Sequence, residues 1–292
     1  MFNRNDMDSF QIRLEDCLKK FIINFFEKPE LKLRFPNKLL RQDVMDLLDT
    51  FCTVVYFPIE NETNNGFHIT DMPFLNGSKS HFVFINTAQS LDKQNFTAAH
   101  ELGHINEVDN YVIEQLALSD TEEIREMIIN RFAATLLMPE ESFVQLFCIE
   151  YEKRNESNGA ISVTNLLKVI VNLMNHFFTP YKAVVNRLFE LGILSEKDKT
   201  FLLDDKSVFK DKIDSIIEEY VIKCGYIKLL KPARPRKWIE GLPALLNEAE
   251  KKDSVSPEKI AYIRNLFELS STASTKIDEM VSLSTCEGND TI

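Results

Sequence analysis

The chain has 292 residues, of which 44% are hydrophobic and 27% charged, so it is long enough to bury a core and is neither wholly disordered nor a bundle of membrane helices. Its formal net charge of -11 argues against non-specific binding to nucleic acid or to anionic membranes, because the average field repels phosphates. The five cysteines are scattered without a C-x-x-C pair, and no apolar stretch reaches the ~18 residues that span a bilayer. We therefore expect a cytoplasmic protein with no membrane partner.

The first part of the chain alternates between amphipathic helices and short strands. Apolar residues at helical spacing predict helices over about 8–27 and 38–51. Runs of β-branched and aromatic residues predict strands at 53–57, 67–69 and 82–85. A few short strands among helices indicate an α+β fold, in which a small, mostly antiparallel sheet packs on helices.

Helical patterns dominate the rest of the chain. They cover about residues 91–107, 121–138, 140–152, 162–177, 180–192, 208–222 and 256–269. The polar run from Tyr151 to Gly159 is the best candidate for a domain boundary. We expect a first domain over 1–150, a helix-turn-helix-like segment over 160–200, a mainly helical region over 201–270 and a disordered tail over 271–292.

Residues 100–104 read H-E-L-G-H inside a segment that can be helical throughout. Residues four apart project from one face of a helix, so the imidazoles of His100 and His104 can reach a single metal ion. Tetrahedral zinc suits that geometry, and Glu101 is placed to accept a proton from the attacking water rather than to bind the metal. Gly103 permits close helix packing. The motif predicts a zinc peptidase with a zincin-type helix and Glu101 as its catalytic base.

A catalytic zinc needs a third protein ligand. The metzincin pattern is excluded because Glu107 and Asn110 stand where it has glycine and histidine, and a carboxylate is therefore favoured. The next helix offers Glu122, Glu123 and Glu126. We favour Glu126, because Asn130 lies four residues later on the same face and can hydrogen-bond the outer nitrogen of a ligand histidine. The other two glutamates are typical of first-turn acids that complement the helix dipole.

The run from Phe96 to His104 and the later run from Glu126 to Pro139 resemble, in this order, the two motif blocks of the ImmA/IrrE family of bacterial metallopeptidases. The resemblance covers about residues 35–145 and extends loosely to about 195. It implies a gluzincin-like site in which His100, His104 and Glu126 hold zinc. It also implies cleavage of a helix-turn-helix repressor, which derepresses genes of a mobile element, a defence system or a stress response. The chain departs from the family pattern at Ile128 and Ile129, and we expect no N-terminal DNA-binding domain.

The sequence leaves alternative interpretations for one strand, for the oxyanion partner and for the function. The strand at 82–86 can be an edge strand that pairs with a substrate peptide or a strand of the core. His68 and Tyr111 are candidates for the group that stabilises an oxyanion. The helix pair around Thr179-Pro180 suggests a non-catalytic zinc-containing module that binds a repressor or DNA, although such a module has no need of Glu101 beside its metal. A zinc hydrolase acting on another bond has the same ligands. We expect a zinc endopeptidase whose partner is a protein substrate rather than nucleic acid.

Overall fold

The computed structural model describes residues 8–35, 39–60, 65–69, 81–155, 161–226 and 237–269. The chain divides into two units, Met1–Arg236 and Lys237–Ile292. The tail expected over 271–292 lies outside the described residues. The finer domain divisions expected at 150 and 200 stay predictions.

The first unit starts with helices and strands close to those predicted. They are α1 (Ser9–Phe26), α2 (Pro29–Arg34), α3 (Asp43–Phe51), β1 (Thr53–Phe57), β2 (Gly66–Ile69) and β3 (Phe82–Asn86). Helix α2 was not predicted, because its six residues are too few to carry a periodic apolar pattern. The predicted helix over 38–51 begins later than expected, at Asp43.

The remaining helices of the first unit are α4 (Leu91–Ile105), α5 (Val108–Leu116), α6 (Glu122–Leu137), α7 (Glu140–Glu152), α8 (Val163–Phe177), α9 (Tyr181–Glu190), α10 (Glu196–Leu203) and α11 (Lys210–Lys223). Helices α5 and α10 were not predicted. The helical character expected for this half is confirmed.

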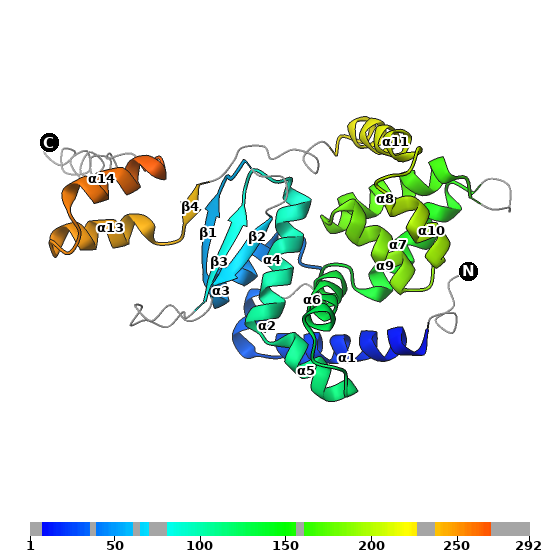
Figure 1. The fold of residues 1–292 in the computed structure, drawn as a ribbon, viewed down its shortest axis with the longest axis horizontal. Coiled ribbons are helices and arrows are strands. Elements are labelled where there is room, and N and C mark those ends of the chain that lie inside the picture. Colours follow the sequence, from blue (N-terminus) through cyan, green and yellow to red (C-terminus); the bar gives the residue numbers. More distant parts are fainter. Residues whose placement is uncertain are drawn as a thin grey trace, which may run out of the picture. The chain divides into compact units, whose positions relative to one another are not determined.

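The three strands of the first unit lie in the order β2-β3-β1 (Figure 1). Strand β3 runs parallel to β1, with Phe82 opposite Thr53, and antiparallel to β2, with Val83 opposite His68. The expected small sheet packed on helices is confirmed, but the sheet is mixed rather than mostly antiparallel. A long connection separates β1 from β3, and only such a connection allows two strands of a sheet to run in the same direction.

Strand β3 has neighbours on both sides, so its main-chain groups are already paired. It is therefore a core strand and not an edge strand that can pair with a peptide, and that alternative is wrong. Strand β2 stands at the margin of the sheet instead. An added strand must approach an edge of this kind.

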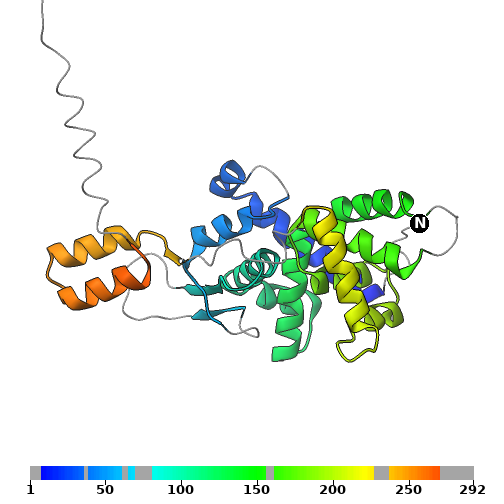
Figure 2. The ribbon, with the colours of Figure 1, turned by 90° about the horizontal axis from the view of Figure 1, so that it is seen from above.

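Helix α4 lies between the strands and α6, as both ribbon views show (Figures 1 and 2). Its apolar face is fully buried through Ala98, Ala99 and Leu102. At Gly103 the two helices come unusually close, because a Cβ built there would lie 2.9 Å from Cδ1 of Phe132 and 3.2 Å from Cδ1 of Ile129. Ordinary carbon contacts are about 3.5–4.0 Å. Only glycine permits this approach, as the sequence suggested.

A buried ion-pair network ties α1, α6 and α9 together. The guanidinium of Arg187 donates two hydrogen bonds of 2.7 Å to the carboxylate of Glu15, and Arg131 donates a further one of 3.0 Å. Arg131 also pairs with Glu190 at 2.7 Å. Burial by itself raises the pKa of Glu15, but the charges of the two arginines and the hydrogen bonds from Arg187 outweigh it and lower the pKa to about 2. The network holds α9 against α6.

The second unit contains β4 (Trp238–Ile239), α13 (Leu242–Lys251) and α14 (Pro257–Leu266). In its described residues, Leu246 of α13 and Ile260 of α14 are the buried apolar side chains. Arg264 links the same two helices, donating a hydrogen bond of 2.7 Å to the Oδ1 atom of Asn247. Helix α14 was predicted, whereas α13 was not.

Within the described residues, no single helix combines the length and the apolar character that crossing a membrane requires. The pair α6 and α7, bent by 66° at their junction, meets the criteria of length and composition only when both helices are taken together.

Candidate metal centre

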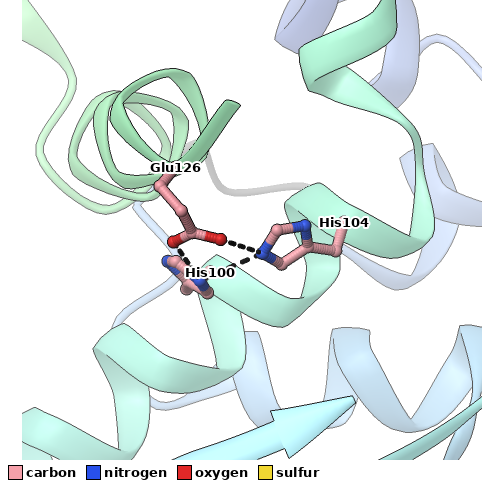
Figure 3. Close-up of side chains that lie close together, drawn as sticks. All are labelled: His100, His104 and Glu126. Atoms are coloured by element: carbon pink, nitrogen blue, oxygen red, sulfur yellow. Dashed lines mark hydrogen bonds and ion pairs between the residues drawn. The ribbon is translucent and has the colours of Figure 1, made fainter. Parts of the chain in front are cut away.

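His100 and His104 of α4 and Glu126 of α6 point toward one another (Figure 3). The Nε2 atoms of the two histidines are 3.1 Å apart. The Oε1 and Oε2 atoms of Glu126 lie 3.3 Å from Nε2 of His104 and 3.5 Å from Nε2 of His100. The structure thus brings together the three side chains that the sequence favoured, and the packing of α4 on α6 is what unites them.

The spacing of these atoms fits a metal ion. Four ligands at bonds of about 2.0–2.2 Å occupy the corners of a tetrahedron whose edges are roughly 3.3–3.6 Å. The separation of 3.1 Å between the two nitrogens lies close to that range, as do the separations of 3.3 and 3.5 Å from them to the two different oxygens of Glu126. Two imidazoles and one carboxylate then leave the fourth corner open, which is the arrangement of a catalytic rather than a structural site. The group can therefore hold a metal ion in an open site.

Asn130 orients the first histidine. Its side-chain amide donates a hydrogen bond of 2.8 Å to the main-chain carbonyl of Glu126, one turn earlier in α6. That bond leaves the Oδ1 atom facing Nδ1 of His100 at 3.2 Å, where it accepts a hydrogen bond. With Nδ1 as the donor, Nε2 of His100 is the free lone pair. The structure thus places the side chain of Asn130 beside the outer nitrogen of His100, the position favoured from the sequence.

The protonation state of His100 suits a metal ligand. Burial, followed by the nearby His104, lowers the pKa of His100 to about 4, and the hydrogen bond with Asn130 offsets part of this effect. The ring is therefore neutral near pH 7. A neutral imidazole is the form that binds metals.

Glu101 follows the first histidine and is almost completely buried. Burial, followed by the charge of Glu126, raises the pKa of Glu101 to about 7. A carboxyl group with a pKa near the working pH exchanges protons readily in both directions. Glu101 is thus suited to accept a proton and return it.

The start of α6 is anchored beside the ligand Glu126. The guanidinium of Arg125 pairs with Asp109 of α5 and, at 2.6 Å, with Asp120. Glu122 and Glu123 are exposed in the first turn and take no part in the metal group. The acids of the first turn and the metal ligand are thus different residues.

His68 approaches the site from β2. It shares a strand face with Gly66, where an added Cβ would lie 2.6 Å from Cγ2 of Thr97 in α4, so this face is turned toward the metal-site helix. Nε2 of His68 contacts Nδ1 of His81 at 3.0 Å. Burial, then His81 and then His104 of the metal group, lower the pKa of His68 to about 4.

Tyr111, the other candidate for an oxyanion partner, packs in a different direction. Its ring centroid lies 5.2 Å from that of Phe21 in α1. Burial, followed by Cys17 of α1, raises the pKa of Tyr111. Of the two candidates, the geometry favours His68.

The model of the IrrE N-terminal-like domain, which describes a family of peptidases, matches residues 50–189. Residues 50–189 belong to this family. The span of the IrrE-like domain includes β1–β3, the metal group and nearly all of α9. The family is one of metal-dependent peptidases, in agreement with the resemblance seen in the sequence. Neither the curated proteins nor the solved structures contain a match to the chain.

The IrrE-like domain also contains residues near the metal group that the motif did not reveal. Phe96 precedes His100 by four residues in α4, and Asp92 precedes Phe96 by four. Both line a cavity that also reaches Asn130. Their i to i+4 spacing was visible in the sequence, but the cavity depends on helices from elsewhere in the chain.

Proposed function

We propose that this chain is a cytoplasmic zinc-dependent endopeptidase that cuts a regulatory protein of the helix-turn-helix repressor type. The observation that carries the proposal is the near-tetrahedral spacing of the nitrogens of His100 and His104 and the carboxylate of Glu126, with the buried Glu101 beside them. Zinc is favoured because two imidazoles and a carboxylate with an open corner form a common catalytic zinc site. The choice of a repressor rests on the family alone.

Zinc, when bound, supplies a Lewis acid that polarises the scissile carbonyl and makes water more acidic. The chain's own residues then move the proton. Glu101 accepts it from the attacking water and later delivers it to the leaving amine, which is a task for a carboxyl group whose pKa is about 7. Asn130 keeps His100 in the orientation that ligation requires.

Two features of β2 support binding of an extended peptide. The strand stands at the margin of the sheet, so its outer main-chain groups can pair with a substrate strand. His68 on the same strand faces α4 and can donate a hydrogen bond to the developing oxyanion as a neutral imidazole. We assign the oxyanion role to His68 on these grounds.

The alternative of a non-catalytic module that binds a repressor or DNA finds less support. A recognition helix must expose a face to the major groove. Helix α9, the second of the suggested pair, has ten residues and exposes only Lys182, while Val184, Val185, Arg187 and Leu188 are buried. The buried Glu101 also has no purpose in a module that only binds.

The test is incubation of the zinc-loaded protein with a candidate helix-turn-helix repressor, followed by mapping of the products by mass spectrometry. We expect Glu101→Gln to retain zinc and to lower the cleavage rate by about 10²–10⁴-fold, which is the usual contribution of general acid–base catalysis. Expression of the repressed genes in cells should fall in parallel. A Glu101→Gln protein that keeps zinc and all its cellular effects would refute the peptidase and favour the binding module.

A further inference from the structure

A large cavity adjoins the metal centre within the first unit. Its volume is about 990 Å³, and its lining comes from α4, α6, α8, α9 and α11, together with Asn65 before β2. Helix α11 lies outside the matched span 50–189. Part of the wall is therefore supplied by a segment beyond the IrrE-like domain.

Two rows of side chains lead from the metal group into this cavity. On α4, Asp92 and Phe96 precede His100 at intervals of four residues. On α6, Asn130 and Ala134 follow Glu126 at the same interval. Residues four apart lie on one side of a helix, so both rows continue the faces that carry the metal ligands. The cavity therefore begins one helical turn from a metal ligand on each of the two helices.

The lysines around the cavity already have partners. Lys210 pairs with Asp214, and Lys182 pairs with Asp205 at 3.2 Å. Lys93 donates a hydrogen bond of 3.3 Å to Oε1 of Gln89.

The acidic side chains of the lining differ in whether their carboxylate oxygens have a partner. Glu190 is held by Arg131 at 2.7 Å. Asp92 is only 4% exposed, and its Oδ1 atom has no hydrogen-bond partner in the part of the chain that the structure describes. Asp92 is therefore a residue of the lining in which one carboxylate oxygen lacks a donor.

Asp92 thus differs from Glu190, which has the guanidinium of Arg131 as its ion-pair partner. Burial raises the pKa of Asp92, and hydrogen bonds with Ser90 and with the main chain of Lys93, followed by the charge of Lys93, offset this only in part. A buried polar atom without a partner is uncommon in proteins, and a ligand is one of its explanations. The aromatic ring of Phe96, one turn closer to the metal group, offers a surface on which a cationic side chain can lie.

We propose that this cavity is a specificity subsite that receives a lysine or arginine side chain of the substrate, with Asp92 accepting a hydrogen bond from its cationic group. The inference rests on the proposed peptidase function. Asp92 precedes His100 by eight residues, or about 12 Å along the helix axis at about 1.5 Å per residue. An extended peptide advances about 3.4 Å per residue, so the basic residue stands three or four positions from the scissile bond.

The experiment uses the zinc-loaded full chain and a mixture of synthetic peptides of random sequence, with cut positions mapped by mass spectrometry. We expect lysine and arginine to be enriched about tenfold at one position three or four residues from the cut, as one charge-assisted hydrogen bond allows. Asp92→Asn should reduce the enrichment to about twofold while peptides without a basic residue at that position are still cut. Asp211→Asn is the matched control, because Asp211 is exposed on α11 outside the lining and should leave the enrichment unchanged.

A second variant covers the case in which Asp92→Asn does not fold. Lys182 is exposed at the lining, so Lys182→Glu can add a negative charge without disturbing the core, and it should increase the basic enrichment. Cleavage without basic enrichment, or enrichment that neither variant changes, overturns the subsite and leaves the peptidase intact. If the wild type cuts the peptides no faster than Glu101→Gln does, the proposed peptidase function and the proposed subsite are both wrong.

Discussion

Gly103→Ala tests whether the close approach of α4 and α6 builds the metal site. The added Cβ would lie 2.9 Å from Cδ1 of Phe132, where ordinary contact requires about 3.5 Å or more, so an atom must move by about 0.6 Å. Phe132 cannot turn aside easily, because it is 1% exposed and its ring meets that of Phe21 edge-on at 6.0 Å. The helices must therefore separate.

Separation of the two helices should lower the stability of the protein only slightly but should lower its affinity for zinc clearly. Overpacking costs about 1–3 kcal/mol, but alanine is favoured over glycine in a helix by up to about 1 kcal/mol, so the metal-free protein should lose only about 0–2 kcal/mol. The ligands lie on both helices, and metal sites tolerate errors of only about 0.2 Å. We therefore expect zinc affinity to fall at least about tenfold.

The assay combines competition for zinc with a chromophoric chelator and urea unfolding of the metal-free protein. Phe132→Leu removes ring atoms from the contact, so adding it to Gly103→Ala should restore part of the lost affinity. Affinity equal to that of the wild type in Gly103→Ala, or no rescue by the second substitution, would show that the helix spacing does not control the site.

Three further predictions concern other side chains. The pKa of Glu15 falls from its ordinary 4.5 to about 2 on folding, which corresponds to about 3 kcal/mol of stability that is present above pH 4.5 and is lost as the pH drops toward 2. Glu15→Gln should therefore flatten the acid side of the urea midpoint plotted against pH for the metal-free protein, and an unchanged slope would contradict the network with Arg187. Asn130→Ala should weaken zinc binding about 10–100-fold in the chelator assay, whereas Asn130→Asp keeps the acceptor and most of the affinity; equal losses would speak against orientation of His100. His68→Ala should lower kcat about 10²–10³-fold with zinc content unchanged, and a normal kcat would remove His68 from the oxyanion role.

The long elements were predictable because their signals are local. A helix over 91–107 was expected and α4 ends at Ile105, while the strand at 53–57 was located to the residue. Helix α5 was missed because its nine residues carry few periodic positions, and left-handed residues, Glu107 and Ala117, flank it. Helix α10 had a readable signal in the capping box of Ser195 and Asp198, which the sequence reading overlooked.

By itself the sequence determined that two histidines stand one helical turn apart with a glutamate beside them, because i to i+4 geometry belongs to the helix alone. It also favoured Glu126, through the spacing to Asn130 on the same helix. Only the tertiary structure decided that α6 meets α4 at Gly103 and closes the ligand set, that β3 is central in the sheet, and that Asp92 faces a cavity. These depend on packing between segments distant in the chain, where the shapes of buried side chains and not local periodicity select the arrangement.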